Sequence, residues 1–216
     1  NPSRFTFDNT ITGNQDLSWS QIPNTDVLGL EAGKPYLLLL RGSRFANLST
    51  NNLITDQTTL RATGSLLTGT QTYDSSDTVN PLSSVQNFYS FIANPYQAIV
   101  DITQINKTNI NPNFYWYWDP TLATNGAYVA VELPIGNPLD PNDFSPTSSN
   151  ADKFLMPGQS VFLQTLNDGN SIVEFTEASK DVNQTQTSIF SENTASKIDI
   201  RLYKANAFNT GKPEVD

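Results

Sequence analysis

The chain has 216 residues, of which 37% are hydrophobic and 15% are charged, and its 12 basic and 21 acidic residues give a net charge of −9. No cluster of Lys and Arg occurs, so nucleic acid is not expected as a partner, because phosphate binding needs a concentrated basic surface. The absence of Cys and His excludes disulfides, thiolate metal sites and both Ser-His-Asp and Cys-His catalysis.

Short apolar runs bounded by Gly, Pro, Asn or Asp recur along the chain, as is typical of antiparallel strands. The predicted strands cover residues 36–41, 59–63, 70–73, 87–93, 114–118, 128–133, 159–165, 171–176 and 197–203. No long window has an apolar period of 3.6, so helix is expected only as a turn or two near residues 100–102 or 183–188. The predicted fold class is therefore all-β: an antiparallel β-sandwich, either jelly-roll-like or built from two packed half-sandwiches.

Turn residues separate several of these strands. Asn94-Pro95 is expected to end a strand, because Pro lacks the N–H that a sheet requires, and Pro157-Gly158 predicts a turn. The segment 167–170 (NDGN) lies between strands 159–165 and 171–176, and its residues tolerate the positive φ of tight turns. This spacing predicts a β-hairpin.

The length suits one large β domain, since sandwiches often exceed 200 residues as a single unit. We expect residues 1–216 to form one β-rich module, and any internal division to fall near residues 70–84. The sequence begins at Asn1 without a Met or a basic and apolar leader, so we expect it to be part of a longer, processed chain. No apolar run approaches the 18 residues of a membrane-spanning helix.

The stretch FYWYWDP, which begins at Phe114, carries five consecutive aromatic residues. Alternation along a strand places Phe114, Trp116 and Trp118 on one face and Tyr115 and Tyr117 on the other. We expect the first face to pack into the core, where aromatic side chains typically bury about 150–250 Å² each. Tyr115 and Tyr117 are then the candidate exposed pair for contact with a ligand such as a sugar.

Two aspartates, Asp140 and Asp143, lie close together in a proline-containing loop at residues 135–150. Carboxylate and amide oxygens are the ligands that Ca²⁺ prefers, so these residues are the candidates for a weak Ca²⁺ site. Their spacing does not match an EF-hand loop, and a solvated turn is the alternative interpretation. No other cofactor or metal is expected.

Carboxylate pairs are the remaining candidates for catalysis, because two acids across a cleft suffice for glycoside hydrolysis. Glu132 and Glu174 lie within predicted strands, and Asp101 and Asp119 lie near strand ends. Nothing in the linear sequence places any two at the required separation. Neither a nucleophile-elbow motif nor a glycine-rich phosphate loop occurs.

Several short segments follow one another in a characteristic order from about Trp19 onward. They are AGKPY at 32–36, RGSR at 41–44, LRATGSL at 60–66, ANPYQ at 93–97 with VD at 100–101, YWDPTL at 117–122, GAYV at 126–129, MPGQSVF at 156–162 and IDIRLY at 198–203. This ordered set resembles a region of long type IX-secreted surface proteins of Bacteroidota, ahead of their C-terminal sorting domain. The family pattern often has Asp where this chain has Ser43.

The resemblance implies a β-rich, non-catalytic module of an exported, often adhesin-like protein, located outside the cell or on the outer-membrane surface. It implies the secretion machinery and neighbouring domains of the parent chain as partners, and it transfers no catalytic residue. Asp77-Thr78-Val79 is similar to the Asp-Ser/Thr-apolar acceptor motif for O-glycosylation in these bacteria. Thr78 is therefore a candidate glycosylation site on an exposed loop.

Three functional hypotheses result. The leading one is a structural or adhesive module of an exported bacterial surface protein, without a cofactor and without a membrane span. The alternative is a carbohydrate-binding module that uses Tyr115 and Tyr117. The third is a glycan-active enzyme that depends on carboxylates such as Glu132 and Glu174.

Overall fold

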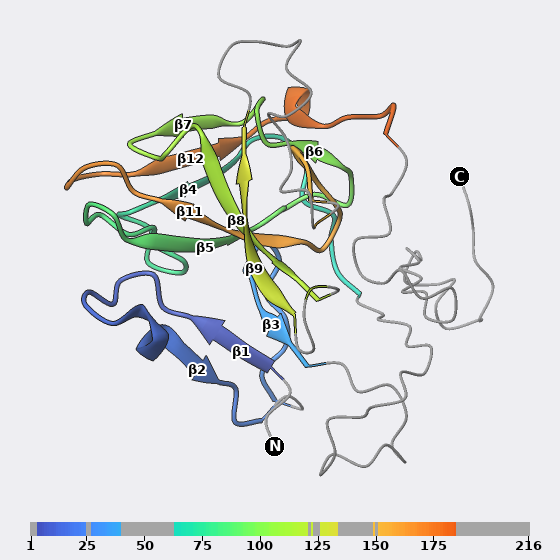
Figure 1. Cartoon of the computed structure of the whole chain (residues 1–216). Coiled ribbons are helices and arrows are strands. Elements are labelled where there is room, and N and C mark those ends of the chain that lie inside the picture. The colour runs from blue at the N-terminus through green and yellow to red at the C-terminus, as the bar shows by residue number, and fades with distance from the viewer. Residues whose placement is uncertain are drawn as a thin grey trace.

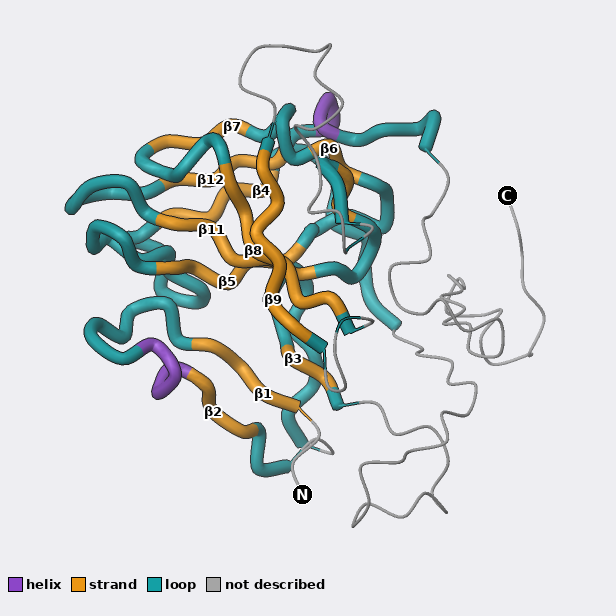
Figure 2. The backbone as a smooth tube through the Cα atoms, in the orientation of Figure 1, coloured by secondary structure: helices purple, strands orange, loops and turns teal. Residues whose placement is uncertain are grey.

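The structure, a computed structural model, describes residues 4–24, 27–39, 63–120, 122, 126–133, 149 and 151–184. These residues form antiparallel strands and two short 3₁₀ turns, which confirms the predicted all-β sandwich with little helix (Figures 1 and 2). The strands are β1 Arg4–Phe7, β2 Trp19–Gln21, β3 Leu37–Leu38, β4 Gln71–Asp74, β5 Tyr89–Ala93, β6 Val100–Asp101, β7 Asn106–Thr108, β8 Phe114–Asp119, β9 Ala127–Glu132, β10 Phe154–Leu155, β11 Ser160–Gln164 and β12 Ile172–Phe175, and the turns are η1 Gln15–Ser18 and η2 Glu177–Ser179.

Two sheets enclose the main core. One has the strand order β5-β11-β8-β9 and the other the order β4-β12-β7. Buried residues alternate along β8, β9 and β12, so one face of each sheet points to the other sheet. Ile92, Tyr115 and Val131 from the first sheet and Val173 and Phe175 from the second are among the buried residues of this core.

A third sheet, of order β2-β1-β3, packs against the outer face of the four-stranded sheet. The ring of Phe7 lies edge-on to that of Phe162 at 5.0 Å between centroids, and Trp19 lies in the same way at 5.3 Å from Phe91. The four-stranded sheet is therefore covered on one face by the main core and on part of the other by β1 and β2 (Figure 1).

Side-chain amides from the loop between β1 and β2 bind the backbone of β5, the first strand of the four-stranded sheet. Asn9 accepts a hydrogen bond from the N–H of Phe91 at 2.7 Å and donates to the carbonyl of Phe91 at 3.3 Å. Gln15 accepts from the N–H of Tyr89 at 3.0 Å and donates to its carbonyl at 2.9 Å. Each amide thus makes the two hydrogen bonds that a neighbouring strand would make.

The predicted hairpin across residues 167–170 is wrong. β11 pairs with β5 and β8, whereas β12 pairs with β4 and β7, so the connecting loop passes from one sheet to the other. Asn109 holds this loop, because its amide donates to the carbonyl of Asn167 at 2.7 Å and accepts from the N–H of Asn167 at 3.0 Å. The turn residues favour a reversal of direction but do not decide whether the two strands pair.

The helical turn expected near residues 100–102 is also wrong, since Val100–Asp101 forms β6 and pairs with β10. The predicted strand at 197–203 lies outside the described residues, as does nearly all of that at 59–63. The range 70–84 contains β4, which belongs to the sandwich, and the loop that follows it. The turn predicted at Pro157-Gly158 is confirmed: Gly158 has φ of +76°, and the N–H of Gln159 donates to the carbonyl of Met156 at 3.1 Å.

Asn94 connects the end of β5 to the segment around β10. Its buried amide group donates to the carbonyls of Ala98 at 2.9 Å, Leu155 at 3.0 Å and Met156 at 3.3 Å. Its carbonyl oxygen accepts from the N–H of Tyr96 at 3.0 Å. The strand end predicted at Asn94-Pro95 is therefore confirmed, and the amide satisfies backbone groups that would otherwise be buried without a partner.

We predict that Asn94→Ala lowers the free energy of unfolding by about 2–4 kcal/mol, because it leaves several buried backbone groups unpaired. Denaturant unfolding measures this change. Asn170→Ala is the matched control: Asn170 is exposed in the loop before β12, and its loss is expected to change stability by less than about 0.5 kcal/mol. Equal effects of the two substitutions would contradict the role given to Asn94.

Lys107 gives the fold a pH-dependent stability. Its ammonium group donates to the carbonyl of Ile102 at 3.1 Å. Burial lowers the pKa of Lys107 from 10.5 to about 8, against a smaller opposite effect of the nearby Asp101 carboxylate. Between these two values the folded chain binds fewer protons than the unfolded chain, so stability increases as the pH rises through this window.

We predict that the free energy of unfolding increases by about 1–2 kcal/mol between pH 8 and about pH 9.5, and that Lys107→Met removes this increase. Measurement stops below pH 10 because burial also raises the pKa of several tyrosines, including Tyr73, and their ionisation destabilises the fold at higher pH. Denaturant unfolding at successive pH values tests this. The same slope in both proteins would show that Lys107 is not its source.

Candidate functional site

Strand β8 carries the aromatic residues that the sequence marks as candidates. The face that was predicted to be exposed is buried, and the face that was predicted to be buried points outward. Tyr115 and Tyr117 are 0% and 3% exposed and belong to the main core, so their prediction as an exposed ligand-binding pair is wrong. They share a face with Val129 and Val131 of β9, which fixes this face inward. The Tyr115 hydroxyl donates to the carbonyl of Asp152, so its polar atom is satisfied despite burial.

Burial also raises the pKa of both tyrosines. Tyr115 and Tyr117 therefore remain neutral hydroxyls at physiological pH and contribute to the core through packing. Sequence reasoning assigned Phe114, Trp116 and Trp118 to the core because of the large area that aromatic side chains bury there. The structure instead buries the tyrosines, because the strands beside them supply their apolar neighbours.

The opposite side of β8 and β9 forms the candidate site, which we call the aromatic face. It consists of three cross-strand pairs on the outer surface of the sheet: Trp118 with Tyr128, Trp116 with Ala130, and Phe114 with Glu132. None of Phe114, Trp116 and Trp118 belongs to the main core, so their predicted burial there is wrong, although Trp116 packs against the second cluster, formed by Phe7, Phe91 and Phe162. Phe114 and Trp116 are half-buried on this face, and Trp118 is 36% exposed.

The most exposed aromatic rings of the face are those of Trp118 and Tyr128. Tyr128 is 48% exposed, and the two ring centroids lie 4.8 Å apart with the planes at 75°. Each ring fixes the other edge-to-face, a favourable arrangement for aromatic pairs. Rings held in this way are preorganised to contact a ligand, because little side-chain freedom remains to be lost on binding.

Gly126 supports the Trp118 indole. A Cβ atom at this position would lie 2.7–2.8 Å from three atoms of the indole, so only glycine permits this contact. The backbone of Gly126 has φ of +84°, a value that glycine adopts without strain. Trp118 therefore rests on bare backbone at the start of β9.

Carboxylates lie at both ends of the aromatic face. Glu132 is exposed opposite Phe114. At the other end, partial burial and the nearby Asp16 carboxylate of η1 raise the pKa of Tyr128, which therefore keeps its hydroxyl proton at neutral pH. The face thus combines apolar ring surface with hydrogen-bond acceptors and a hydroxyl donor.

Sequence reasoning missed Tyr128, although a signal was present. In the run YVAVEL at 128–133, the apolar residues Val129 and Val131 alternate with Tyr128, Ala130 and Glu132. If Val129 and Val131 point into the core, this alternation places Tyr128 on the outer face of the sheet. The strand register places Tyr128 directly opposite Trp118, and the sequence of β8 alone does not show this register.

The other predicted site residues do not join the aromatic face. Thr78 is exposed in the loop after β4, and its glycosylation stays a prediction. Asp140 and Asp143 lie outside the described residues. Within the part of the chain that the structure describes, no group of three or more His, Cys, Asp or Glu side chains is arranged to hold a metal ion.

The candidate catalytic glutamates do not face one another. Glu132 lies on the outer face of β9, and Glu174 lies on the outer face of β12, where it accepts a hydrogen bond from Asn106 at 2.9 Å. Because the inner faces of both strands line the shared core, these two carboxylates point away from one another. They cannot act together across a cleft.

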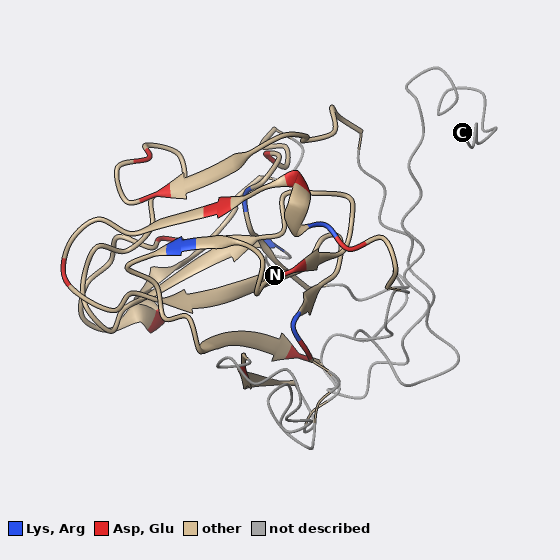
Figure 3. Cartoon of the chain, turned by 90° about the horizontal axis from the view of Figure 1, so that it is seen from above, with Lys and Arg blue, Asp and Glu red and all other residues tan. Residues whose placement is uncertain are grey.

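The two candidate aspartates are buried in structural contacts. Asp101 forms an ion pair with Lys153 at 2.7 Å and accepts from the Thr103 hydroxyl at 2.6 Å. Asp119 is 1% exposed and accepts from the Ser149 hydroxyl. Charged residues of the described part are spread over several strands and loops (Figure 3).

Comparisons with protein-family models, with curated proteins and with solved structures give no match for this chain. Among the described residues, no helix has the length and hydropathy needed to cross a membrane.

We predict that Gly126→Ala displaces the Trp118 indole and destabilises the fold by about 1–3 kcal/mol, through steric contact added to backbone strain. Gly69→Ala is the matched control, since Gly69 also has positive φ, +70°, but a Cβ there meets nothing within 4 Å. Near-ultraviolet circular dichroism and denaturant unfolding measure the two effects. An unchanged aromatic spectrum in Gly126→Ala would contradict the indole–glycine contact.

Proposed function

We propose that this chain is a non-catalytic, adhesive β-sandwich module of an exported bacterial surface protein, and that it binds extended glycans through the aromatic face. The observation that carries the glycan part is the exposed pair Trp118 and Tyr128, fixed edge-to-face on a rigid sheet. This function combines the adhesive module of the leading hypothesis with the carbohydrate binding of the alternative. Trp118 and Tyr128 take the place of Tyr115 and Tyr117 as the residues that contact the sugar.

The chemistry of the face suits a polysaccharide. The apolar C–H side of a sugar ring stacks on aromatic surface, and its hydroxyl groups require polar partners at the rim. Successive cross-strand pairs on one face lie about 7 Å apart, so three pairs form a strip about 14 Å long, which exceeds a single sugar ring. Glu132, exposed opposite Phe114, supplies an acceptor for hydroxyl groups.

Charge favours a neutral glycan over an anionic one. The chain has a net charge of −9, and the Glu132 carboxylate lies at one end of the aromatic face. An anionic polysaccharide would be repelled at low ionic strength, whereas a neutral one would not. The proposed ligands are therefore neutral polysaccharides.

The sequence resemblance supports the cellular context. An ordered set of segments from AGKPY at 32–36 to IDIRLY at 198–203 is similar to a region of the type IX-secreted surface proteins of Bacteroidota. An extracellular or outer-membrane surface location would bring the aromatic face into contact with glycans of other cells or of the surroundings. The secretion machinery and neighbouring domains of the parent chain are the proposed protein partners, and Thr78 the proposed site of O-glycosylation.

We predict that the double variant Trp118→Ala/Tyr128→Ala weakens binding to a neutral polysaccharide at least about tenfold, which corresponds to about 1.4 kcal/mol. Affinity electrophoresis against a panel of soluble polysaccharides measures this, and quenching of tryptophan emission in the wild type gives a second readout. Leu166→Ala is the control, since Leu166 is similarly exposed, at 39%, but lies outside the aromatic face. Absence of retention on every neutral polysaccharide, or equal retention of the double variant, would refute the proposal.

A further inference from the structure

The four-stranded sheet ends in two edge strands of different character. At one edge, the side chains of Asn9 and Gln15 are hydrogen-bonded to the backbone of β5. At the other edge, β9 pairs with β8 on one side, and no described strand pairs with it on the other (Figure 1). Unpaired N–H and C=O groups on such an edge can bond to a strand of another chain.

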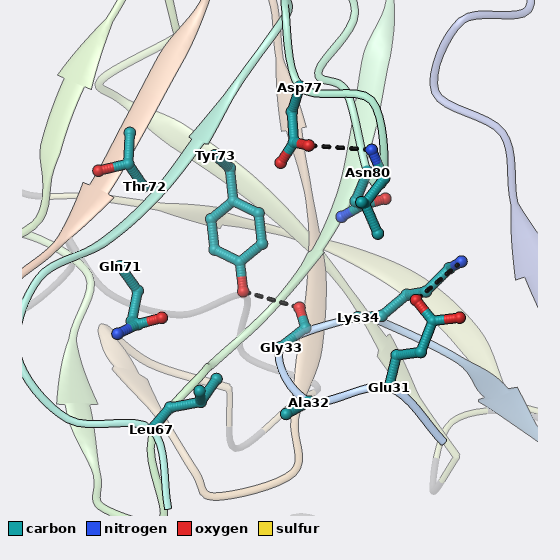
Figure 4. A pocket seen from close by; sticks show the side chains of 11 residues that line it. Glu31, Ala32, Gly33, Lys34, Leu67, Gln71, Thr72, Tyr73, Asp77 and Asn80 are labelled. Carbon is teal, nitrogen blue, oxygen red and sulfur yellow. Dashed lines mark hydrogen bonds and ion pairs between the residues drawn. The ribbon is translucent and has the colours of Figure 1, made fainter. Parts of the chain in front are cut away.

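The remaining edge strands of the described part offer less to an added strand. β2 and β7 have three residues each, and β3, β6 and β10 have two each. β4 has four residues, and the turn at 31–34 lies beside it: the Tyr73 hydroxyl donates to the carbonyl of Gly33 at 2.7 Å, and both residues line a hollow of about 190 Å³ (Figure 4). With six residues, β9 is the longest described strand at a sheet edge.

The hydrogen bonds between β8 and β9 show which backbone groups of β9 are free. The N–H of Leu133 donates to the carbonyl of Asn113 at 2.6 Å, in continuation of the β8–β9 register. Bonded and non-bonded pairs alternate along an antiparallel ladder, so the odd-numbered residues of β9 bond to β8. The N–H and C=O groups of Tyr128, Ala130 and Glu132 therefore point to the open edge.

The residues of β9 do not protect this edge. Natural edge strands are commonly protected by Lys, by Pro or by a β-bulge. β9 contains no Lys and no Pro, and its register with β8 is continuous from Ala127 to Glu132, so it has no bulge. Its one charged residue, Glu132, lies at its end. An added strand would therefore meet a regular and largely neutral edge.

This edge is complementary to a second copy of itself. In an antiparallel ladder both residues of a bonded pair must have free groups, so even-numbered residues must face even-numbered residues. Pairing about Ala130 places Ala130 opposite the partner's Ala130 and Tyr128 opposite the partner's Glu132. All three free residues of each strand then form bonded pairs, whereas a shift by two residues would leave one of them outside the overlap of the two strands.

The side chains suit the same register. Val129 and Val131 are buried on the core side of β9, and each would lie beside the other valine of the partner strand. On the outer side, the Glu132 carboxylate would face Tyr128 of the other copy and not a second carboxylate. The net charge of −9 opposes association at longer range, and salt screens this repulsion.

We propose that two copies of this chain pair through β9, in antiparallel register about Ala130, and so join their four-stranded sheets into one continuous sheet. Each copy uses the same edge, so the contact is isologous and closes at two copies. The partner is therefore a second copy of this chain, and the assembly is a dimer.

The pairing would join two aromatic faces into one. Side chains at positions 128, 130 and 132 lie on the outer surface of both copies of β9, so Tyr128 would lie between Trp118 of its own chain and the partner's Glu132. The joined face would span the β8 and β9 strands of both copies, about 14 Å across at about 4.8 Å per strand. The pairing stands by itself, whereas this consequence for glycan binding rests on the proposed function.

Sedimentation equilibrium of the full chain at neutral pH tests the dimer. We expect a Kd of about 10–100 µM, as for a small and transient interface, and a lower Kd as the salt concentration rises from about 50 to about 500 mM. Ala130→Lys is expected to raise the Kd at least about tenfold, because like charges would lie directly opposite one another. Thr72→Lys is the matched control: it makes the same charge change at an exposed position of β4 and is expected to keep the wild-type Kd.

Hydrogen exchange of the backbone amides, followed by nuclear magnetic resonance, tests the register in the unsubstituted chain. The N–H groups of Tyr128, Ala130 and Glu132 are expected to exchange slowly above the Kd and rapidly below it. Those of Val129 and Val131 bond to β8 and are expected to exchange slowly at both concentrations. This readout does not depend on whether a variant folds.

Three results would overturn the proposal. The first is a monomer at every concentration up to about 1 mM. The second is a dimer whose Kd is unchanged by Ala130→Lys. The third is slow exchange at Tyr128, Ala130 and Glu132 that does not depend on concentration, since another segment of the same chain, such as 197–203, would then occupy the edge. None of these measurements uses a glycan, so a failure of the dimer and a failure of polysaccharide binding are observed separately.

Discussion

The two-residue alternation of β8, in which aromatic residues occupy both faces, is the constraint on which the rest of the structure depends. Tyr115 and Tyr117 fill the core between the two main sheets, so the other three aromatic residues must lie on the outer face of the strand. Part of that outer face is covered by the third sheet through Phe7 and Trp19. Trp116 packs against that covered part, and the rings of Trp118 and Tyr128 remain exposed beside it, so one strand contributes to both the core and the candidate site.

Local sequence signals predicted where the strands and turns of this fold occur better than they predicted which strands pair with one another. Turn chemistry correctly located the bend at Pro157-Gly158 and the strand end at Asn94-Pro95, because these depend on backbone preferences of the residues themselves. The sequence NDGN at 167–170 was equally clear as a turn, yet it joins two sheets. Pairing is decided by which distant strands supply hydrogen bonds, and a turn sequence contains no information about them.

For the candidate site, too, the sequence predicted the local element but not its surroundings in the fold. The sequence identified β8 as the strand of interest and separated its two faces, but it did not show which face would be inward. That choice depends on Val129 and Val131 of β9, which bury the tyrosine side, and on the third sheet, which covers only some of the rings.

The amides of Asn9 and Gln15 have a further consequence for the behaviour of the chain at high concentration. A strand with free N–H and C=O groups is a template on which another chain can add a strand and start an aggregate. At β5 these groups on Tyr89 and Phe91 are already occupied by side chains, which cannot propagate a sheet. Many copies can therefore be packed side by side without joining through this edge.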